Sequence, residues 1–70
     1  MAPMEGDYEL SKAIQKLRTL NRSVPNREER WRRTSWYGVT EHTMRLLQIQ
    51  GVVEKRRVSD DQPVQWRQKV

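Results

Sequence analysis

The second half of the chain constrains the fold most, because a helical pattern over residues 39–50 ends at Gly51 and passes directly into a basic, strand-like segment. Apolar residues recur at helical spacing in the first part, and Thr40 suits the N-cap, so we expect a helix over residues 40–50. Residues 52–58 and 63–69 then predict two β-strands joined by a polar turn. This part of the chain therefore folds as a helix followed by a β-hairpin.

The two predicted strands differ in regularity. Val64 and Trp66 point one way, and the polar and basic residues between and after them point the other way, which is the alternation of a strand with one dry face. In the first strand Val53 and Val58 have opposite parity. That strand is expected either to contain a bulge or to end early.

An apolar stripe near the N-terminus predicts another helix, over residues 7–21, with Asp7 as its N-cap. Residues 1–6 are expected to be a flexible lead-in. The stripe consists of residues spaced three or four positions apart, namely Leu10, Ala13, Ile14, Leu17 and Leu20. Such a stripe is the face that a helix buries against its neighbours.

The middle of the chain is mostly charged. Ser23–Pro25 is a candidate for a very short third strand, because a residue before proline is biased toward extended geometry. Asn26 has the character of an N-cap, which predicts a helix over residues 27–36. Gly38 is expected to end that helix with a positive φ. Because the chain has no Phe, we expect Trp31 and Trp66 to supply much of the core.

Length and composition narrow the function classes. A chain of 70 residues allows one domain, here over residues 7–70, and its small core leaves a homodimer or a partner protein open. The net charge of +5 favours a polyanionic partner. We find no bilayer-spanning run and no export signal, so a cytoplasmic location without membrane binding is the expectation.

The residues do not indicate an enzyme. The chain has no Cys and a single His, His42, which has no nucleophile within its own motif. It also lacks a glycine-rich phosphate loop and any spacing typical of metal ligands. We therefore expect no catalytic residues, no metal and no cofactor.

The stretch Thr43–Leu47, followed by Gly51–Arg57, two aspartates and a strand of the form V-x-W-x, resembles winged helix-turn-helix DNA-binding domains. It is similar to MarR-type and related small bacterial or phage transcription regulators. The resemblance implies an α+β fold in which three helices precede a two-stranded wing. It also implies sequence-specific binding of double-stranded DNA, with the third helix in the major groove and the wing on phosphates.

Residue roles follow from this resemblance. The outer arc of the third helix would contact base edges through Glu41, His42, Arg45 and Gln48. Phosphates would be contacted by basic residues of the second helix and the wing, namely Arg27, Arg30, Arg33, Lys55, Arg56, Arg57, Arg67 and Lys69.

Each role has a plainer interpretation beside it. The polar arc is also what any solvated helix face shows, and the arginines of the second helix are also spaced to pair with neighbouring glutamates. Trp36 and Tyr37, if exposed, would form a surface for a partner protein or stack on a base. A winged helix that binds only protein, and an RNA-binding hairpin, therefore remain alternatives.

Overall fold

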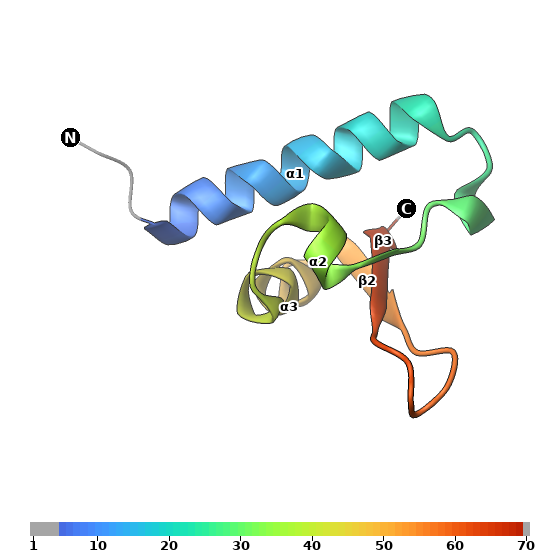
Figure 1. The fold of residues 1–70 in the computed structure, drawn as a ribbon. Helices are drawn as coiled ribbons and strands as arrows, with labels where there is room; N and C mark the ends of the chain where they lie inside the picture. The colour runs from blue at the N-terminus through green and yellow to red at the C-terminus, as the bar shows by residue number, and fades with distance from the viewer. Residues whose placement is uncertain (1–4, 70) are drawn as a thin grey trace.

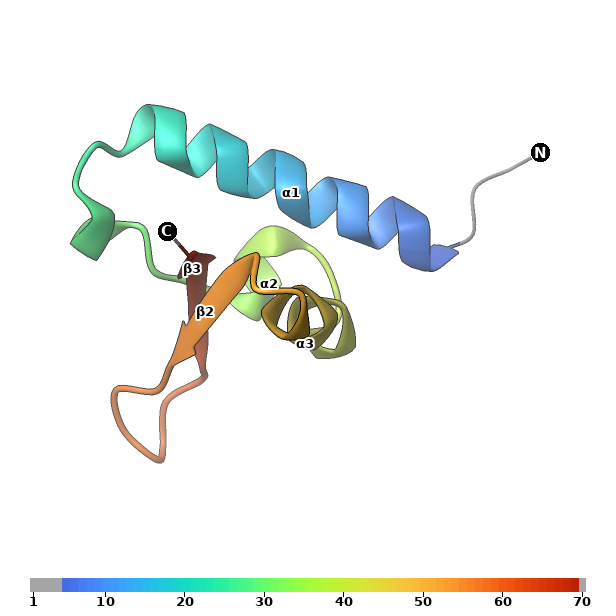
Figure 2. The same cartoon turned by 180° about the vertical axis from the view of Figure 1, so that it is seen from behind.

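The computed structural model describes residues 5–69 as an α+β domain with three α-helices and a three-stranded antiparallel sheet. Helix α1 (Glu5–Ser23) runs along one side of the molecule, and the loop between strands β2 (Val53–Arg56) and β3 (Gln65–Gln68) projects away from it on the other (Figures 1 and 2). Helices α2 (Thr34–Tyr37) and α3 (Glu41–Ile49) lie between them. No helix among these residues is long and apolar enough to cross a membrane.

The sheet has the strand order β1-β3-β2, so the last strand in the sequence lies in the middle. Strand β1 (Arg32–Arg33) pairs with β3 through Arg32 opposite Trp66. Strand β2 pairs with the other edge of β3, with Glu54 opposite Arg67. Directly opposed residues share a face, so this register decides which basic side chains meet the core and which meet solvent.

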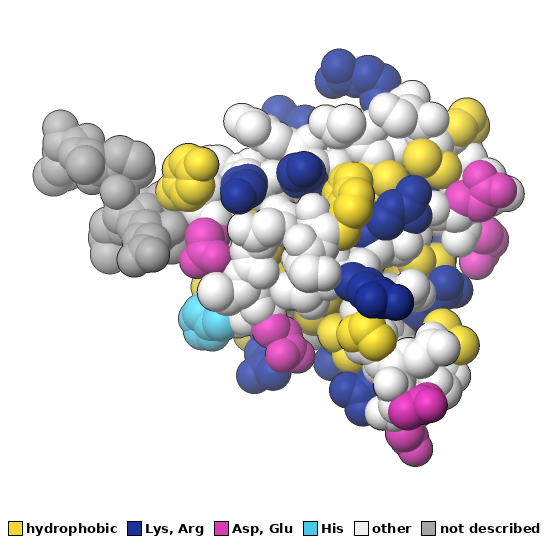
Figure 3. Space-filling view, in the orientation of Figure 1, with side chains coloured by type: hydrophobic (Ala, Val, Ile, Leu, Met, Phe, Trp, Pro, Cys, Tyr) yellow, Lys and Arg dark blue, Asp and Glu magenta, His cyan; other side chains and the backbone are white. Residues whose placement is uncertain are grey.

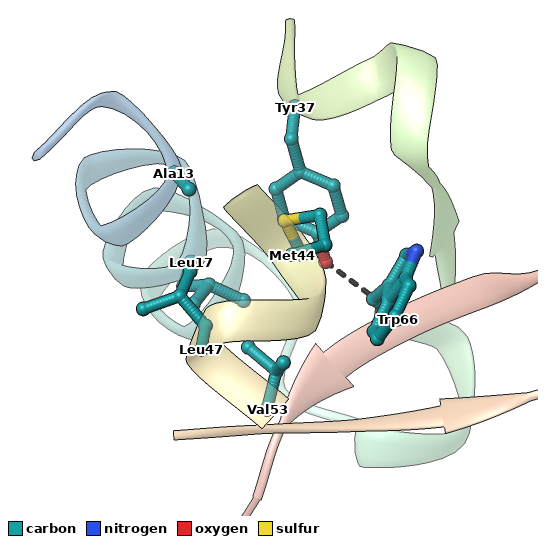
Figure 4. Close-up of a cluster of buried hydrophobic side chains, with 7 residues drawn as sticks. All are labelled: Ala13, Leu17, Tyr37, Met44, Leu47, Val53 and Trp66. Atoms are coloured by element: carbon teal, nitrogen blue, oxygen red, sulfur yellow. Dashed lines mark hydrogen bonds between the residues drawn. The ribbon is translucent and has the colours of Figure 1, made fainter. Parts of the chain in front are cut away.

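The core lies where α1, α2 and α3 meet one face of the sheet. Figure 4 shows the buried cluster, which consists of Ala13, Leu17, Tyr37, Met44, Leu47, Val53 and Trp66. The predicted stripe of α1 faces this cluster, with Leu10 and Ile14 packed against its margin. The periodicity of α1 therefore identified its buried face correctly. In α3 the same spacing identified Thr43, Met44 and Leu47, but Ile49, which it also placed on the apolar face, is exposed.

Two glycines end helices as the sequence indicated. Gly38 follows α2 with a φ of 69°, and Gly51 follows α3 with a φ of 77°. Both values lie in the left-handed region that glycine enters without steric cost. Of the two alternatives for the first hairpin strand, the early end is the one observed: the strand expected over residues 52–58 covers only Val53–Arg56, and Val58 is exposed.

The predicted helix over residues 27–36 is wrong. The Asn26 cap is real, because its side chain accepts from the amide of Glu28 at 3.0 Å, but it begins only a 3-10 turn, η1 (Arg27–Glu29). The chain then extends to pair with β3 before the single turn of α2. This charged segment has no apolar stripe to bury, so pairing with the sheet edge satisfies its backbone instead.

The third strand is also not where we expected it. Helix α1 ends at Ser23, the amide of Val24 donates to the carbonyl oxygen of Leu20 at 2.9 Å, and residues 23–25 form no strand. The N-terminal prediction shifts as well, because α1 begins at Glu5, before the expected cap at Asp7. Residues 1–4 of the expected lead-in lie outside the described residues.

Candidate nucleic-acid interface

Helix α3 presents a polar arc to solvent. Thr43, Met44 and Leu47 point into the core, which leaves the opposite side of the helix exposed. All four side chains predicted to contact bases lie on that side, namely Glu41, His42, Arg45 and Gln48. The structure thus places these residues together on one accessible helix face, which is the arrangement that a groove-binding helix needs.

The N-terminus of α3 is fixed by two side chains. The hydroxyl of Thr40 accepts from the amide of Thr43 at 3.3 Å, as expected for an N-cap. The amide of Thr40 donates to Oε1 of Glu9 at 3.0 Å. In a capping box a residue of the same helix makes this second bond. Here Glu9 of α1 makes it, so the bond also ties α3 to α1, a link that local sequence patterns do not reveal.

The charges on the α3 arc nearly cancel. Arg45 Nη2 lies 3.7 Å from Oε1 of Glu41, one turn earlier, and both side chains are more than half exposed. Exposed ion pairs of this kind contribute about 0–1 kcal/mol, so Arg45 can leave Glu41 for a base edge at little cost. Because the two charges cancel, this face of α3 has little long-range attraction for phosphates. Its side chains are suited to hydrogen bonds with base edges instead.

The hairpin next to α3 carries exposed basic side chains on its stem and none at its tip. Lys55 and Arg57 are exposed on the stem and form no ion pair with another described residue. Asp60 and Asp61 occupy the tip and are exposed. The hydroxyl of Ser59 donates to Oδ1 of Asp61 at 2.6 Å and lowers the pKa of that carboxyl. Any phosphate contact would therefore come from the stem.

Arg67, predicted to contact phosphate, is instead held within the molecule. Its Nε lies 2.7 Å from Glu54 Oε1, and its Nη1 lies 3.3 Å from Glu28 Oε1 and 3.1 Å from the carbonyl oxygen of Arg27. The side chain is only 11% exposed, and its guanidinium covers the ring of Trp31 at 4.3 Å. Arg67 thus binds β3 to β2 and to η1.

Three more of the predicted phosphate residues have internal partners. Arg30 donates to the carbonyl oxygens of Val24 and Pro25 at 2.7 and 3.1 Å, which closes the turn after α1. Arg27 donates to the carbonyl oxygen of Gln68 at 3.2 Å. Arg56 donates to Oε1 of Gln65 at 2.9 Å. The remaining predicted residues are exposed, namely Arg33, Lys55, Arg57 and Lys69.

The aromatic residues differ in how deeply they are buried. Trp66 is buried in the core as predicted. Trp31 is only partly buried and lies on the outer face of the sheet, between the guanidinium groups of Arg56 and Arg67. Trp36 is 36% exposed, whereas Tyr37 is fully buried. The proposed Trp36–Tyr37 partner surface is therefore corrected to a surface that contains Trp36 alone.

The described residues contain no group of three His, Asp or Glu side chains that could hold a metal ion. Comparison of the chain with protein-family models, with curated proteins and with solved structures found no match. Function is therefore inferred from the arrangement of the residues themselves.

Proposed function

We propose that this chain is a winged helix domain that binds double-stranded DNA and regulates transcription. The observation that carries this proposal is the exposed polar arc of α3 beside a hairpin with a basic stem. Helix α3 leads through Gly51 directly into β2, so the helix and the hairpin lie next to each other in space (Figures 1 and 2). A duplex that accepts α3 in its major groove would meet the hairpin stem on its backbone.

The element order supports the same proposal. Three helices precede the β2–β3 hairpin in the chain, as a winged helix requires, and β1 pairs with the free edge of β3. The second helix of the proposed domain is then the single turn of α2. The residues assigned to the duplex are Glu41, His42, Arg45 and Gln48 for bases, and Lys55 and Arg57 for phosphates.

The test is duplex binding as a function of salt, with two matched arginine variants. Wild-type affinity should fall as the salt concentration rises, because bound phosphates release counterions. Arg57→Gln should weaken all sequences alike and reduce the salt slope by about one. Arg45→Gln should mainly reduce the preference between sequences. Affinity that is independent of salt, or two variants that behave alike, would contradict the assignment.

A second candidate function is protein binding through α3. Ile49, at the C-terminal end of the helix, is 76% exposed, so this apolar side chain is accessible to another protein. Ile49→Glu should abolish a homodimer or partner contact through this end, and sedimentation would detect a change in mass. If Ile49→Glu leaves the mass unchanged and duplex binding intact, the DNA-binding proposal stands alone.

A further inference from the structure

A second surface, separate from α3, is centred on Trp36. Two hollows flank this side chain, one of about 380 Å³ and one of about 390 Å³. The described residues that line them come from α1, α2, β3 and the segment that contains β1, and none comes from α3. Trp36 lines both hollows and connects them into one surface.

The lining of these hollows combines aromatic rings with cations. The first contains Trp31, Arg32, Arg33, Ser35, Trp36 and Gln65. The second contains Tyr8, Lys12, Gln15, Lys16, Thr19 and Trp36. None of the described residues that line the two hollows is a carboxylate or has an aliphatic hydrocarbon side chain. Figure 3 shows this face, where hydrophobic and basic side chains alternate over α1 and α2 while acidic ones lie at the margins.

Several hydrogen-bond donors here have no partner. The indole N–H of Trp31 is buried and has no acceptor among the described residues. Arg33 is exposed and forms no ion pair with them. Arg32 is held in place, because its Nη1 donates to the carbonyl oxygens of Glu29 and Trp31 at 2.6 and 2.8 Å. A cation held in place beside an exposed cation with no ion pair among the described residues fits an anionic ligand.

The ring of Trp36 provides the apolar part of such a site. Lys16 Nζ lies 5.1 Å from the ring centroid, and the Arg32 guanidinium lies 5.8 Å from it. A partly exposed aromatic ring with two cations close to it offers stacking to a base and charge to the flanking phosphates. The cations around the ring favour a polyanion over an uncharged apolar anchor of a protein partner.

We infer that the Trp36 surface binds single-stranded nucleic acid, with a base stacked on Trp36 and phosphates paired with Lys16 and Arg33. This site shares no assigned residue with the duplex-binding arc of α3. The two activities are therefore separable by mutation, and the failure of one does not imply the failure of the other.

The test uses a short labelled oligothymidylate and the same duplex in parallel binding assays. Trp36→Ala should weaken oligothymidylate binding about tenfold, the loss expected from removing one base stack, while duplex affinity stays within about twofold. Trp36→Phe, which keeps an aromatic ring, should restore most of the affinity. Arg45→Gln should show the opposite pattern and spare oligothymidylate.

A charge variant keeps the test valid if Trp36→Ala impairs folding. Lys16→Gln/Arg33→Gln changes two polar surface positions, so the fold should persist, and oligothymidylate binding should still fall several-fold with a smaller salt slope. Oligothymidylate binding that is absent in the wild type, or unchanged in both the Trp36 and the charge variants, would overturn the inference. Equally tight binding of a polyglutamate peptide would overturn it too, in favour of an acidic protein partner.

Discussion

The hydroxyl group of Tyr37 donates a 2.7 Å hydrogen bond to the main-chain carbonyl oxygen of Trp66 (Figure 4). This bond ties the one-turn helix α2 to the middle strand of the sheet, and both side chains are buried. Burial raises the pKa of Tyr37 above its ordinary value, although the positive charge of Arg32 opposes the shift. The neutral, bonded phenol is therefore the form that the folded state requires.

Tyr37→Phe should lower the free energy of unfolding by about 1–2 kcal/mol at neutral pH, because it leaves the buried carbonyl oxygen of Trp66 without its donor. Urea unfolding monitored by circular dichroism would measure this change. Tyr8→Phe is the matched control. Tyr8 is 62% exposed, so the loss of its hydroxyl group should change the free energy of unfolding little. Equal effects of the two substitutions would contradict the importance of the bond.

The raised pKa of Tyr37 also predicts a pH dependence. The stabilisation it provides is fully present below the unfolded pKa of about 10 and is lost as the pH rises toward the higher folded value. The stability difference between wild type and Tyr37→Phe should therefore be constant near neutral pH and shrink above pH ~10. Unfolding curves for both proteins at several alkaline pH values would test this, and a constant difference would argue against titration of Tyr37.

Arg67 should matter for stability more than for DNA binding. Arg67→Ala removes the ion-pair partner of Glu28 and leaves Glu54 only its longer contact, 4.0 Å, with Arg27. We expect a loss of about 2–3 kcal/mol in the free energy of unfolding. Arg57→Ala removes the same charge from an exposed position and should change stability by less than about 0.5 kcal/mol. Urea unfolding of both variants distinguishes the two roles, and similar losses would count against the structural role of Arg67.

The sequence predicted the parts of this fold that have a regular period. The stripes of α1 and α3 and the alternation around Trp66 each bury one face, so their pattern was visible without the structure. The two-residue strand β1 has no period of its own and exists only because the edge of β3 accepts it. The role of Arg67 was missed for a similar reason, because Glu28 and Glu54 become its neighbours only after the sheet forms.

The candidate sites also include one part that the sequence predicted and one part that it did not. The exposed arc of α3 followed from helical spacing once the buried face was known. The Trp36 surface did not, because its lining residues come from separate elements that the fold brings together. Sequence also could not distinguish exposed Trp36 from buried Tyr37, since the two are neighbours on a single helical turn whose orientation is set by tertiary contacts.

The link between Glu9 and Thr40 gives a test of how α3 is held in place. Thr40→Ala should cost about 1 kcal/mol, the usual value for a lost N-cap. Glu9→Gln should cost less, because an amide oxygen can still accept the bond from the Thr40 amide. Thr19→Ala is a suitable control, since its hydroxyl bonds only to a carbonyl within α1. Thermal unfolding should rank Thr40→Ala as the most damaging of the three, and any other order would contradict the cap's role.

The acidic tip of the hairpin should weaken duplex binding if the hairpin lies along the DNA backbone. Asp60 is exposed, so Asp60→Asn removes one negative charge from the tip without removing a hydrogen bond known in the structure. We expect tighter duplex binding by a few-fold at low salt, with the difference disappearing as salt screens the charge. Glu29→Gln is matched in charge but lies on η1, away from the tip, and should have a smaller effect. Anisotropy titrations at two salt concentrations measure both, and equal gains would mean that net charge alone, and not the position of the hairpin tip, sets the affinity.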